Sequence, residues 1–200
     1  MANTQQQFGF QHNGFLPGYA PDYQLTRMAI QSSFATKIWY GDPVIKSAST
    51  QYIQPASGTG NLTAIAGVFY GCWYVPSGGG APVYSPFWPA SQQTDATALV
   101  MAAPGATFKA AALLTAIPAT AIGQNVGFST GAGGTTFGLG FSTFTVDQGT
   151  LTTGSTAPFQ IVDMLANVAV GNGTDNTTNF NQVIVTFNNA RFRAGQTGVA

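Results

Sequence analysis

Hydrophobic and polar residues alternate near the end of the chain, in the stretch QVIVTF at residues 182–187. A period of two is typical of a strand that buries one face. Further short strands are predicted at residues 37–47, 62–75, 83–88, 97–103, 106–114 and 159–165, between glycine, proline and other turn-forming residues. No segment keeps a helical period over three turns, and Pro118 limits residues 112–128 to one short helical turn. The pattern predicts an all-β fold, a β-barrel or a β-sandwich, built as one unit or as two small β subdomains.

Residues 1–36 lack this pattern. They hold Gln, Asn and isolated aromatic residues without a sustained period, apart from a short turn expected in DYQLTRMAI at residues 22–30. A segment that buries little of itself is either disordered or ordered by a partner. We expect an extended N-terminal arm over residues 1–36 and a β-rich domain over residues 37–200, with a subdivision near residues 103–110 left open. The alternative for the arm is an edge strand that packs back onto its own domain.

Charge is scarce along the whole chain. Only 6% of the 200 residues are charged, against about 25% in an ordinary soluble protein, and the net charge is zero. The 44% of hydrophobic residues nevertheless excludes a disordered chain. A foldable chain with so little charge to repel its copies favours a protein that spends its life packed against neighbours.

The same composition argues against several partners and compartments. Six scattered Lys and Arg residues form no basic stripe for nucleic acid. No apolar stretch approaches the roughly 20 residues of a membrane-spanning helix. The start MANTQQQFGF has no features of a signal peptide, and the single cysteine, Cys72, fits synthesis in a reducing cytoplasm. Neither nucleic acid nor a membrane is therefore expected as a partner.

No set of residues predicts catalysis. His12 is the only histidine, and it has no second metal ligand at a suitable spacing. A Ser or Cys nucleophile would depend on this one base, and a chain without Glu offers no evident carboxylate pair for glycoside hydrolysis. The run Gly78–Gly80 lacks the Gly-Lys-Ser/Thr sequence of a phosphate loop. We expect no enzyme, no cofactor and no metal site.

Residues 67–90 are rich in aromatic side chains and contain no charged residue. In VFYGCWYV, residues 68–75, aromatic residues occupy both parities, so both faces of the strand require cover. Core packing, a subunit interface and a sugar-stacking platform all stay open for these rings.

Several longer motifs follow one another in a fixed order. They are WYGDPVIKS, IAGVFYGCWYV, PVYSPFWPAS and ATFKA, and then AIGQNVGF, PFQIVDML and VIVTFNNARFRAGQTG. Over roughly residues 37–197, this series resembles structural proteins of tailed bacteriophages. The ordered series is much more specific than any one of its motifs.

The resemblance implies a virion component, above all a capsid decoration (cement) protein. Such proteins are small β-rich subunits that bind outside a completed shell, bridge neighbouring major-capsid subunits and carry no catalytic residues. The expected partner is the major capsid protein of the same phage. The subunit itself is expected to be made in the host cytoplasm and to sit on the capsid surface as a homo-oligomer, a dimer or a trimer.

Large apolar side chains are the candidates for partner binding, because they bury much surface with few torsions to fix. The candidates are Phe8, Phe10, Phe15, Leu16, Tyr19, Tyr23, Trp73 and Trp88. Two other functions stay open. One is a tail or fibre subunit of the virion, and the other is a soluble β-sandwich that binds glycans through Trp73 and Trp88.

Overall fold

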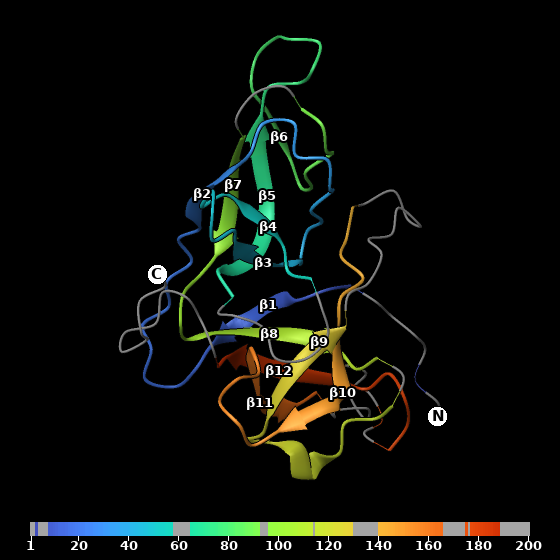
Figure 1. Ribbon diagram of the computed structural model, residues 1–200. Coiled ribbons are helices and arrows are strands. Elements are labelled where there is room, and N and C mark those ends of the chain that lie inside the picture. Colours follow the sequence, from blue (N-terminus) through green and yellow to red (C-terminus); the bar gives the residue numbers. More distant parts are fainter. Residues whose placement is uncertain are drawn as a thin grey trace.

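Two antiparallel sheets form the protein, one above the other in Figure 1. The computed structural model describes residues 3, 8–57, 65–92, 96–113, 115–129, 140–165, 175 and 177–188. The beginning of the predicted strand at residues 62–75 and the end of the last motif, from residue 189 onward, lie outside these described residues.

The lower sheet, called sheet A here, has six strands. Their order across the sheet is β1 (Gln11–Phe15), β8 (Ala106–Ala111), β12 (Gln182–Phe187), β11 (Phe159–Met164), β9 (Asn125–Ser129) and β10 (Thr145–Thr152). A short 3-10 helix, η1 (Ala119–Ala121), precedes β9 directly after Pro118, where one short helical turn is predicted.

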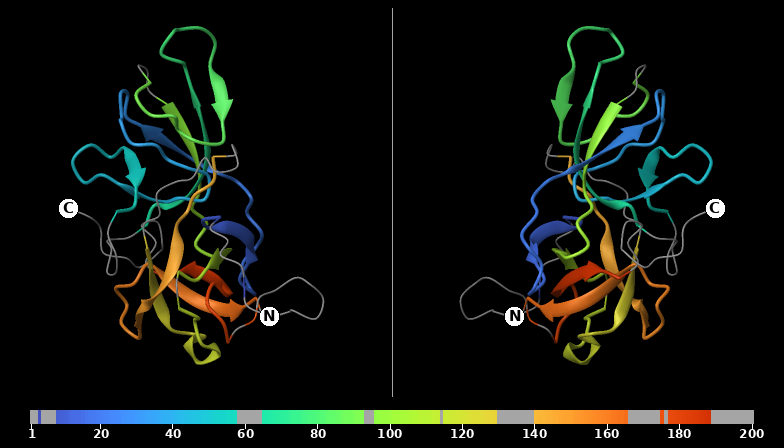
Figure 2. Two further views of the ribbon diagram at one scale, coloured as in Figure 1. Left: turned by 90° about the vertical axis from the view of Figure 1, so that its right-hand side faces the viewer. Right: turned by 90° about the vertical axis from the view of Figure 1, so that its left-hand side faces the viewer.

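The upper sheet, sheet B, also has six strands. Five of them follow the order β2 (Thr26–Ile30), β7 (Ala96–Met101), β5 (Gly67–Tyr74), β3 (Pro43–Lys46) and β4 (Ile53–Pro55). The sixth, β6 (Val83–Ser85), pairs with the far end of β5. The loop that joins β5 to β6 projects from the top of the molecule, as the turned views in Figure 2 also show.

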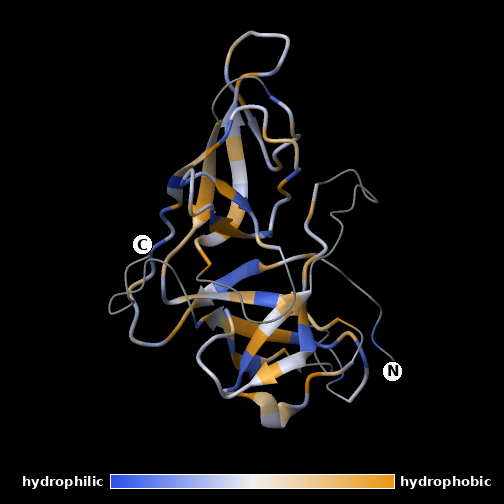
Figure 3. Cartoon of the chain, viewed as in Figure 1, coloured by the Kyte–Doolittle hydropathy of each residue, from blue (hydrophilic) through white to orange (hydrophobic). Residues whose placement is uncertain are grey.

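Each sheet has its own hydrophobic core. On β12, Val183, Val185 and Phe187 are buried, as the alternation in QVIVTF predicts. They pack in the core of sheet A, while Met28 and Phe69 belong to the core of sheet B. Figure 3 shows hydrophobic residues along the strands of both sheets. Each fully buried side chain of this size stabilises the fold by about 1.5–3 kcal/mol.

The two cores meet where sheet B faces sheet A. Val68 on β5 and Met101 on β7 lie in sheet B but pack in the core of sheet A. The described residues therefore form a sandwich-like all-β fold, and no closed barrel is found among them. The fold class is confirmed, and the structure selects the sandwich over the barrel.

The turn at residues 39–42 connects the two sheets through its backbone. The Phe10 N–H, just before β1, donates to the Gly41 carbonyl at 3.0 Å. The Gly41 N–H donates to the Phe69 carbonyl at 2.8 Å, and the Phe69 N–H donates to the Asp42 carbonyl at 2.9 Å. One short turn thus connects the residue that precedes β1 of sheet A to β5, the central strand of sheet B.

A third segment, just before β10, reaches the same turn. The Tyr40 N–H donates to the Gly140 carbonyl at 3.1 Å, and the Ser142 N–H donates to the Tyr40 carbonyl at 2.8 Å. The segments approach so closely that a Cβ on Gly9 would lie 2.4 Å from the Ser142 Cβ. Gly9 also has a φ of +70°, which L side chains rarely adopt, so this junction requires glycine there.

Residues 11–15 and 26–30 are part of the two sheets, and this corrects the prediction of a separate extended arm at residues 1–36 for the part of it that the structure describes. β1 pairs with β8 at the edge of sheet A, and β2 pairs with β7 at the edge of sheet B. Phe10 is fully buried and stacks on Phe159, with 4.5 Å between ring centroids. Residues 8–30 instead match the alternative, in which the segment packs back onto its own domain as edge strands. A domain boundary at residue 37 would separate β1 and β2 from the sheets to which they belong.

Deleting residues 1–24 is therefore expected to prevent folding of the remainder. The deletion removes β1 and the Phe10 ring, and loss of a buried Phe side chain alone costs about 3–5 kcal/mol. Small domains are stable by only about 5–15 kcal/mol. Circular dichroism and thermal melting of the truncated chain check this, with Asn13→Ala, an exposed position on β1, as the control that stays within about 0.5 kcal/mol of the parent. A truncated chain that melts cooperatively near the parent temperature would contradict it.

Candidate functional site: two exposed aromatic surfaces

The structure separates the eight predicted partner-binding residues into a buried group and an exposed group. Phe10 and Trp88 are both 0% exposed, so neither can contact a partner. The Trp88 Nε1–H donates to the Phe34 carbonyl at 3.0 Å, and its ring packs edge-on against Tyr74. These two predictions are wrong, because the side chains belong to the cores of sheets A and B.

Tyr19, Tyr23 and Trp73 are exposed, as a role in partner binding requires. Phe8, Phe15 and Leu16 are partly buried. Phe8 lies under the Lys109 ammonium, with 5.1 Å from Nζ to the ring centroid. The exposed predicted residues fall into two separate places, a loop between the sheets and a pair of strands in sheet B.

The first place, called the loop surface here, is residues 16–25 between β1 and β2. The Tyr19 ring, 52% exposed, lies so close to Gly105 that a Cβ there would be 2.4 Å from the ring. The Leu16 N–H donates to the Gly105 carbonyl at 2.9 Å, which fixes the start of the loop. Tyr23, 68% exposed, packs edge-on against Phe15 at 5.3 Å. Each tyrosine thus contacts a neighbour, Gly105 or Phe15, and leaves at least half of its side chain exposed to solvent.

The second place, called the aromatic platform here, consists of Trp73 on β5 and Tyr84 on β6. The two residues pair across the strands, and their ring centroids are 5.6 Å apart with a tilt of 57°. Trp73 is 48% exposed and Tyr84 49% exposed. Both faces of residues 68–75 are expected to be covered. This holds at Phe69, which packs in the core of sheet B, and at Tyr70, which packs against the core of sheet A, but not at Trp73.

Tyr84 is one of the aromatic residues in the stretch 67–90 for which a sugar-stacking role stays open, but sequence reasoning missed its pairing with Trp73 on one face of sheet B. A β-bulge between Phe69 and Gly71 shifts the register of β5 and decides which face Trp73 occupies. The available signal was Gly71 within an aromatic run, because glycine inside a strand often marks a bulge or a close approach.

The reactive side chains of the fold lie in surroundings that suppress reactivity. Burial raises the pKa of the Cys72 thiol to about 12, which disfavours the nucleophilic thiolate. The His12 ring packs against Phe15, Tyr23 and Phe108 rather than facing open solvent. Desolvation lowers the His12 pKa against the opposing effect of the Gly14 backbone, so the ring is neutral at pH 7.

Within the described part of the chain, no three His, Cys, Asp or Glu side chains lie close enough together to hold a metal ion. The same part of the chain contains no helix that is long and apolar enough to cross a membrane.

Asp42 is the only charged side chain among the buried residues that the structure describes. Its Oδ2 accepts a hydrogen bond from the Trp39 N–H at 2.7 Å, while its buried Oδ1 has no partner of good geometry among these residues. Burial raises the Asp42 pKa to about 7, against the lowering effects of the Trp39 N–H and the Ser142 side chain. A carboxyl group that titrates near neutrality therefore sits inside the turn that joins the sheets.

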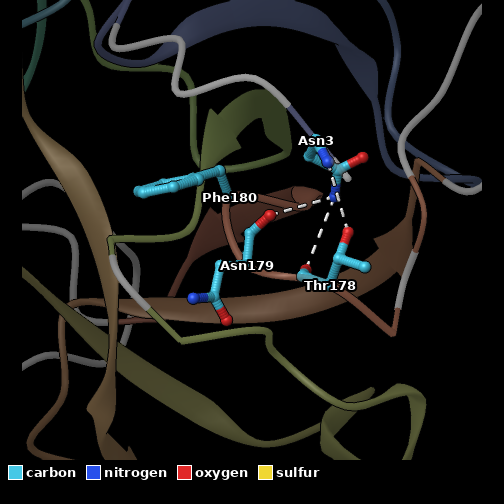
Figure 4. Close-up of a pocket in the computed structure, with 4 residues that line it drawn as sticks. All are labelled: Asn3, Thr178, Asn179 and Phe180. Atoms are coloured by element: carbon cyan, nitrogen blue, oxygen red, sulfur yellow. Dashed lines mark hydrogen bonds between the residues drawn. The ribbon is translucent and has the colours of Figure 1, made fainter. Parts of the chain in front are cut away.

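A pocket of about 380 Å³ lies where Asn3 meets residues 178–180. Figure 4 shows the Asn3 side chain pointing at the backbone of this loop. Its Nδ2 donates to the carbonyls of Asp175 at 2.8 Å and Asn179 at 3.1 Å, and its Oδ1 accepts from the Asp175 N–H at 2.9 Å. The side-chain amide of Asn3 thus forms its hydrogen bonds with backbone groups of the same chain, so we assign this contact a structural role.

Comparisons with protein families, with curated proteins and with solved structures find no significant match for this chain.

The raised Asp42 pKa predicts a specific pH dependence of stability. The folded pKa, about 7, lies above the unfolded value of 3.8, so the folded state holds this proton more tightly. The stabilisation is complete below pH 4 and is lost as the pH rises through 7, with a slope on the order of 1 kcal/mol per pH unit in between. Replacing Asp42 with Asn removes this contribution, while the contribution of His12 stays in both proteins.

Urea unfolding of the parent and of Asp42→Asn at intervals from pH 4 to pH 8 measures the effect. The difference in unfolding free energy between the two proteins should move steadily in favour of the Asp42→Asn variant as the pH rises. A difference that is constant over this range would show that the Asp42 pKa is not raised.

Proposed function

We propose that this chain is a structural subunit of a tailed-bacteriophage virion, which binds the capsid surface and bridges major-capsid subunits as a decoration protein. The loop surface is the observation on which the proposal rests most directly. It offers two exposed aromatic rings on a backbone that is already fixed at both ends by β1 and β2. Such rings give up little entropy on binding, and aromatic residues dominate the energy of protein interfaces.

The phage-like motifs support the proposal through the fold that they build. WYGDPVIKS contains the turn at residues 39–42, and IAGVFYGCWYV contains β5 with the Gly71 bulge. PVYSPFWPAS contains β6 and the buried Trp88, and ATFKA forms most of β8. The motifs thus contain the turn that joins the sheets and several core strands of the sandwich.

The small number of charges supports the same role. A surface with few charges is neither repelled by neighbouring copies nor dependent on salt-sensitive ion pairs. Asp22 is the only charged residue between Leu16 and Leu25, so contacts through the loop surface would rest mainly on apolar burial. We extend the proposal to a homo-oligomeric subunit, a dimer or a trimer, on the capsid.

The other candidate functions differ in how well they fit. A tail or fibre subunit would share the fold and the loop surface, and particle composition distinguishes it. A glycan-binding module that uses Trp73 and Trp88 together does not fit, because Trp88 is fully buried and its indole N–H is bonded to Phe34.

Replacing Tyr19 and Tyr23 together with Ala should weaken binding to undecorated capsids at least tenfold, which is a loss of about 1.4 kcal/mol. The two rings are the large apolar groups that the loop surface exposes. Sedimentation of capsids with the labelled protein measures the bound fraction at each concentration. The control is Ile122→Ala, which removes another exposed large apolar side chain, next to η1.

Thermal melting of both variants must first show that they remain folded. Unchanged capsid binding by the folded double variant, or an equal loss in Ile122→Ala, would refute the role of the loop surface.

A further inference from the structure

We infer that the aromatic platform of Trp73 and Tyr84 is a binding site for a neutral saccharide. This site is separate from the loop surface, and it does not depend on whether the protein binds a capsid. The apolar C–H face of a pyranose ring stacks on an exposed aromatic ring, and two adjacent rings can take two sugar units or two faces of one. The inference rests on the rigidity, the neighbours and the open surroundings of the two rings.

The Tyr84 ring is held in place before any ligand arrives. Its hydroxyl donates to the Tyr70 carbonyl at 3.1 Å, which draws the side chain across β5. The ring lies over Gly71, where a Cβ would be only 2.6 Å from the Tyr84 Oη and 2.9 Å from its Cε2. Gly71 has a φ of +135°, so both the backbone and the space require glycine there. A preorganised ring loses little freedom on binding, which matters for a ligand that makes few contacts.

The same face of sheet B continues from the rings with small and polar side chains. In the register of the sheet, Tyr84 lies opposite Trp73, Trp73 opposite Thr97, and Thr97 opposite Ala29. The row therefore runs from two large rings to a hydroxyl and a methyl group, which leaves room beside Trp73. Thr97 supplies a hydroxyl that can donate or accept a hydrogen bond.

No charged side chain belongs to this row. Among the residues that the structure describes, the charged residue that the register places nearest on this face is Arg27, which pairs with Leu99 in the next row and lies on the far edge strand β2. Rings without an adjacent charge favour a neutral ligand over an acidic or a basic one.

The surroundings of the platform argue for a saccharide rather than a protein. Energetically important residues of a protein interface sit within a ring of contacts that excludes water. Here the row beside Trp73 continues with the small side chains of Thr97 and Ala29. The two rings, tilted by 57°, thus have little side-chain surface around them to form such a ring of contacts, whereas stacking of a sugar does not require one.

Tryptophan fluorescence provides a selective test, because Trp39 and Trp88 are buried and Trp73 alone is exposed. The full-length protein is titrated separately with maltohexaose, cellohexaose and the hexamer of N-acetylglucosamine. We expect a saturable blue shift with at least one of them, with a Kd at or below about 1 mM. The absence of any shift with all three at about 10 mM would overturn the inference.

Calorimetry with the best of these saccharides then assigns the site. Trp73→Ala should weaken binding at least tenfold, and Tyr84→Phe, which keeps the ring but loses its anchor to Tyr70, should weaken it by about threefold. Ile122→Ala, which changes an exposed apolar residue outside both the platform and the loop surface, should bind as the parent does. Equal affinity of the parent and the Trp73→Ala variant would overturn the inference.

The capsid-binding assay separates this site from a protein interface. Trp73→Ala should bind capsids as the parent does, since the proposed capsid contact lies on the loop surface. A Trp73→Ala variant that loses capsid binding would identify the platform as a protein contact and overturn the saccharide assignment. Failure of the loop-surface variants alone would instead count against the capsid role and leave the saccharide titration unaffected.

Discussion

The turn at residues 39–42 is the constraint on which the two-sheet arrangement depends. Its backbone groups bond to Phe10 before β1, to Phe69 on β5 and to the segment 140–142 before β10. These segments are far apart in the sequence, and they meet only because Gly9 and Gly41 leave room for the crossing backbones. The cost is a buried carboxyl group at Asp42, whose proton is held near neutral pH. The junction thereby couples the packing of both sheets to one titratable group.

The aromatic residues divide between the two cores and two exposed surfaces. Large rings such as Phe108, Phe128 and Trp88 fill the two cores, and the exposed rings among the described residues are few. Tyr19 and Tyr23 lie on the connection that crosses from sheet A to sheet B, while Trp73 and Tyr84 lie on the outer part of sheet B. The two surfaces differ in their support, because one lies on a loop between two strands and the other on two paired strands of a sheet.

The fold class could be predicted because period-two alternation is a local property, as residues 182–187 show. The roles of β1 and β2 could not, since QHNGF at residues 11–15 has no alternation and is a strand only through its distant pairing with β8. Beyond the bulge before Gly71, the side chains of β5 no longer follow the alternation set by the residues before it. The exposure of Trp73 could therefore not be predicted from the period of two alone. The burial of Trp88 could not be predicted either, because its segment is rich in turn residues. Its burial depends on contacts with residues distant in the sequence, such as Ile38 and Phe34. The pairing of Trp73 with Tyr84 likewise depends on the register across a long hairpin.

We propose that the protein is a structural part of a phage particle. Quantitative mass spectrometry of purified, intact phage particles, from a phage whose genome carries this sequence, tests the proposal most directly. A capsid decoration subunit would be recovered in a constant ratio to the major capsid protein, at tens to hundreds of copies on the order of the shell's own subunit number. It would also be released from the shell without loss of the tail proteins. Recovery of the chain only in the particle-free lysate would contradict the claim.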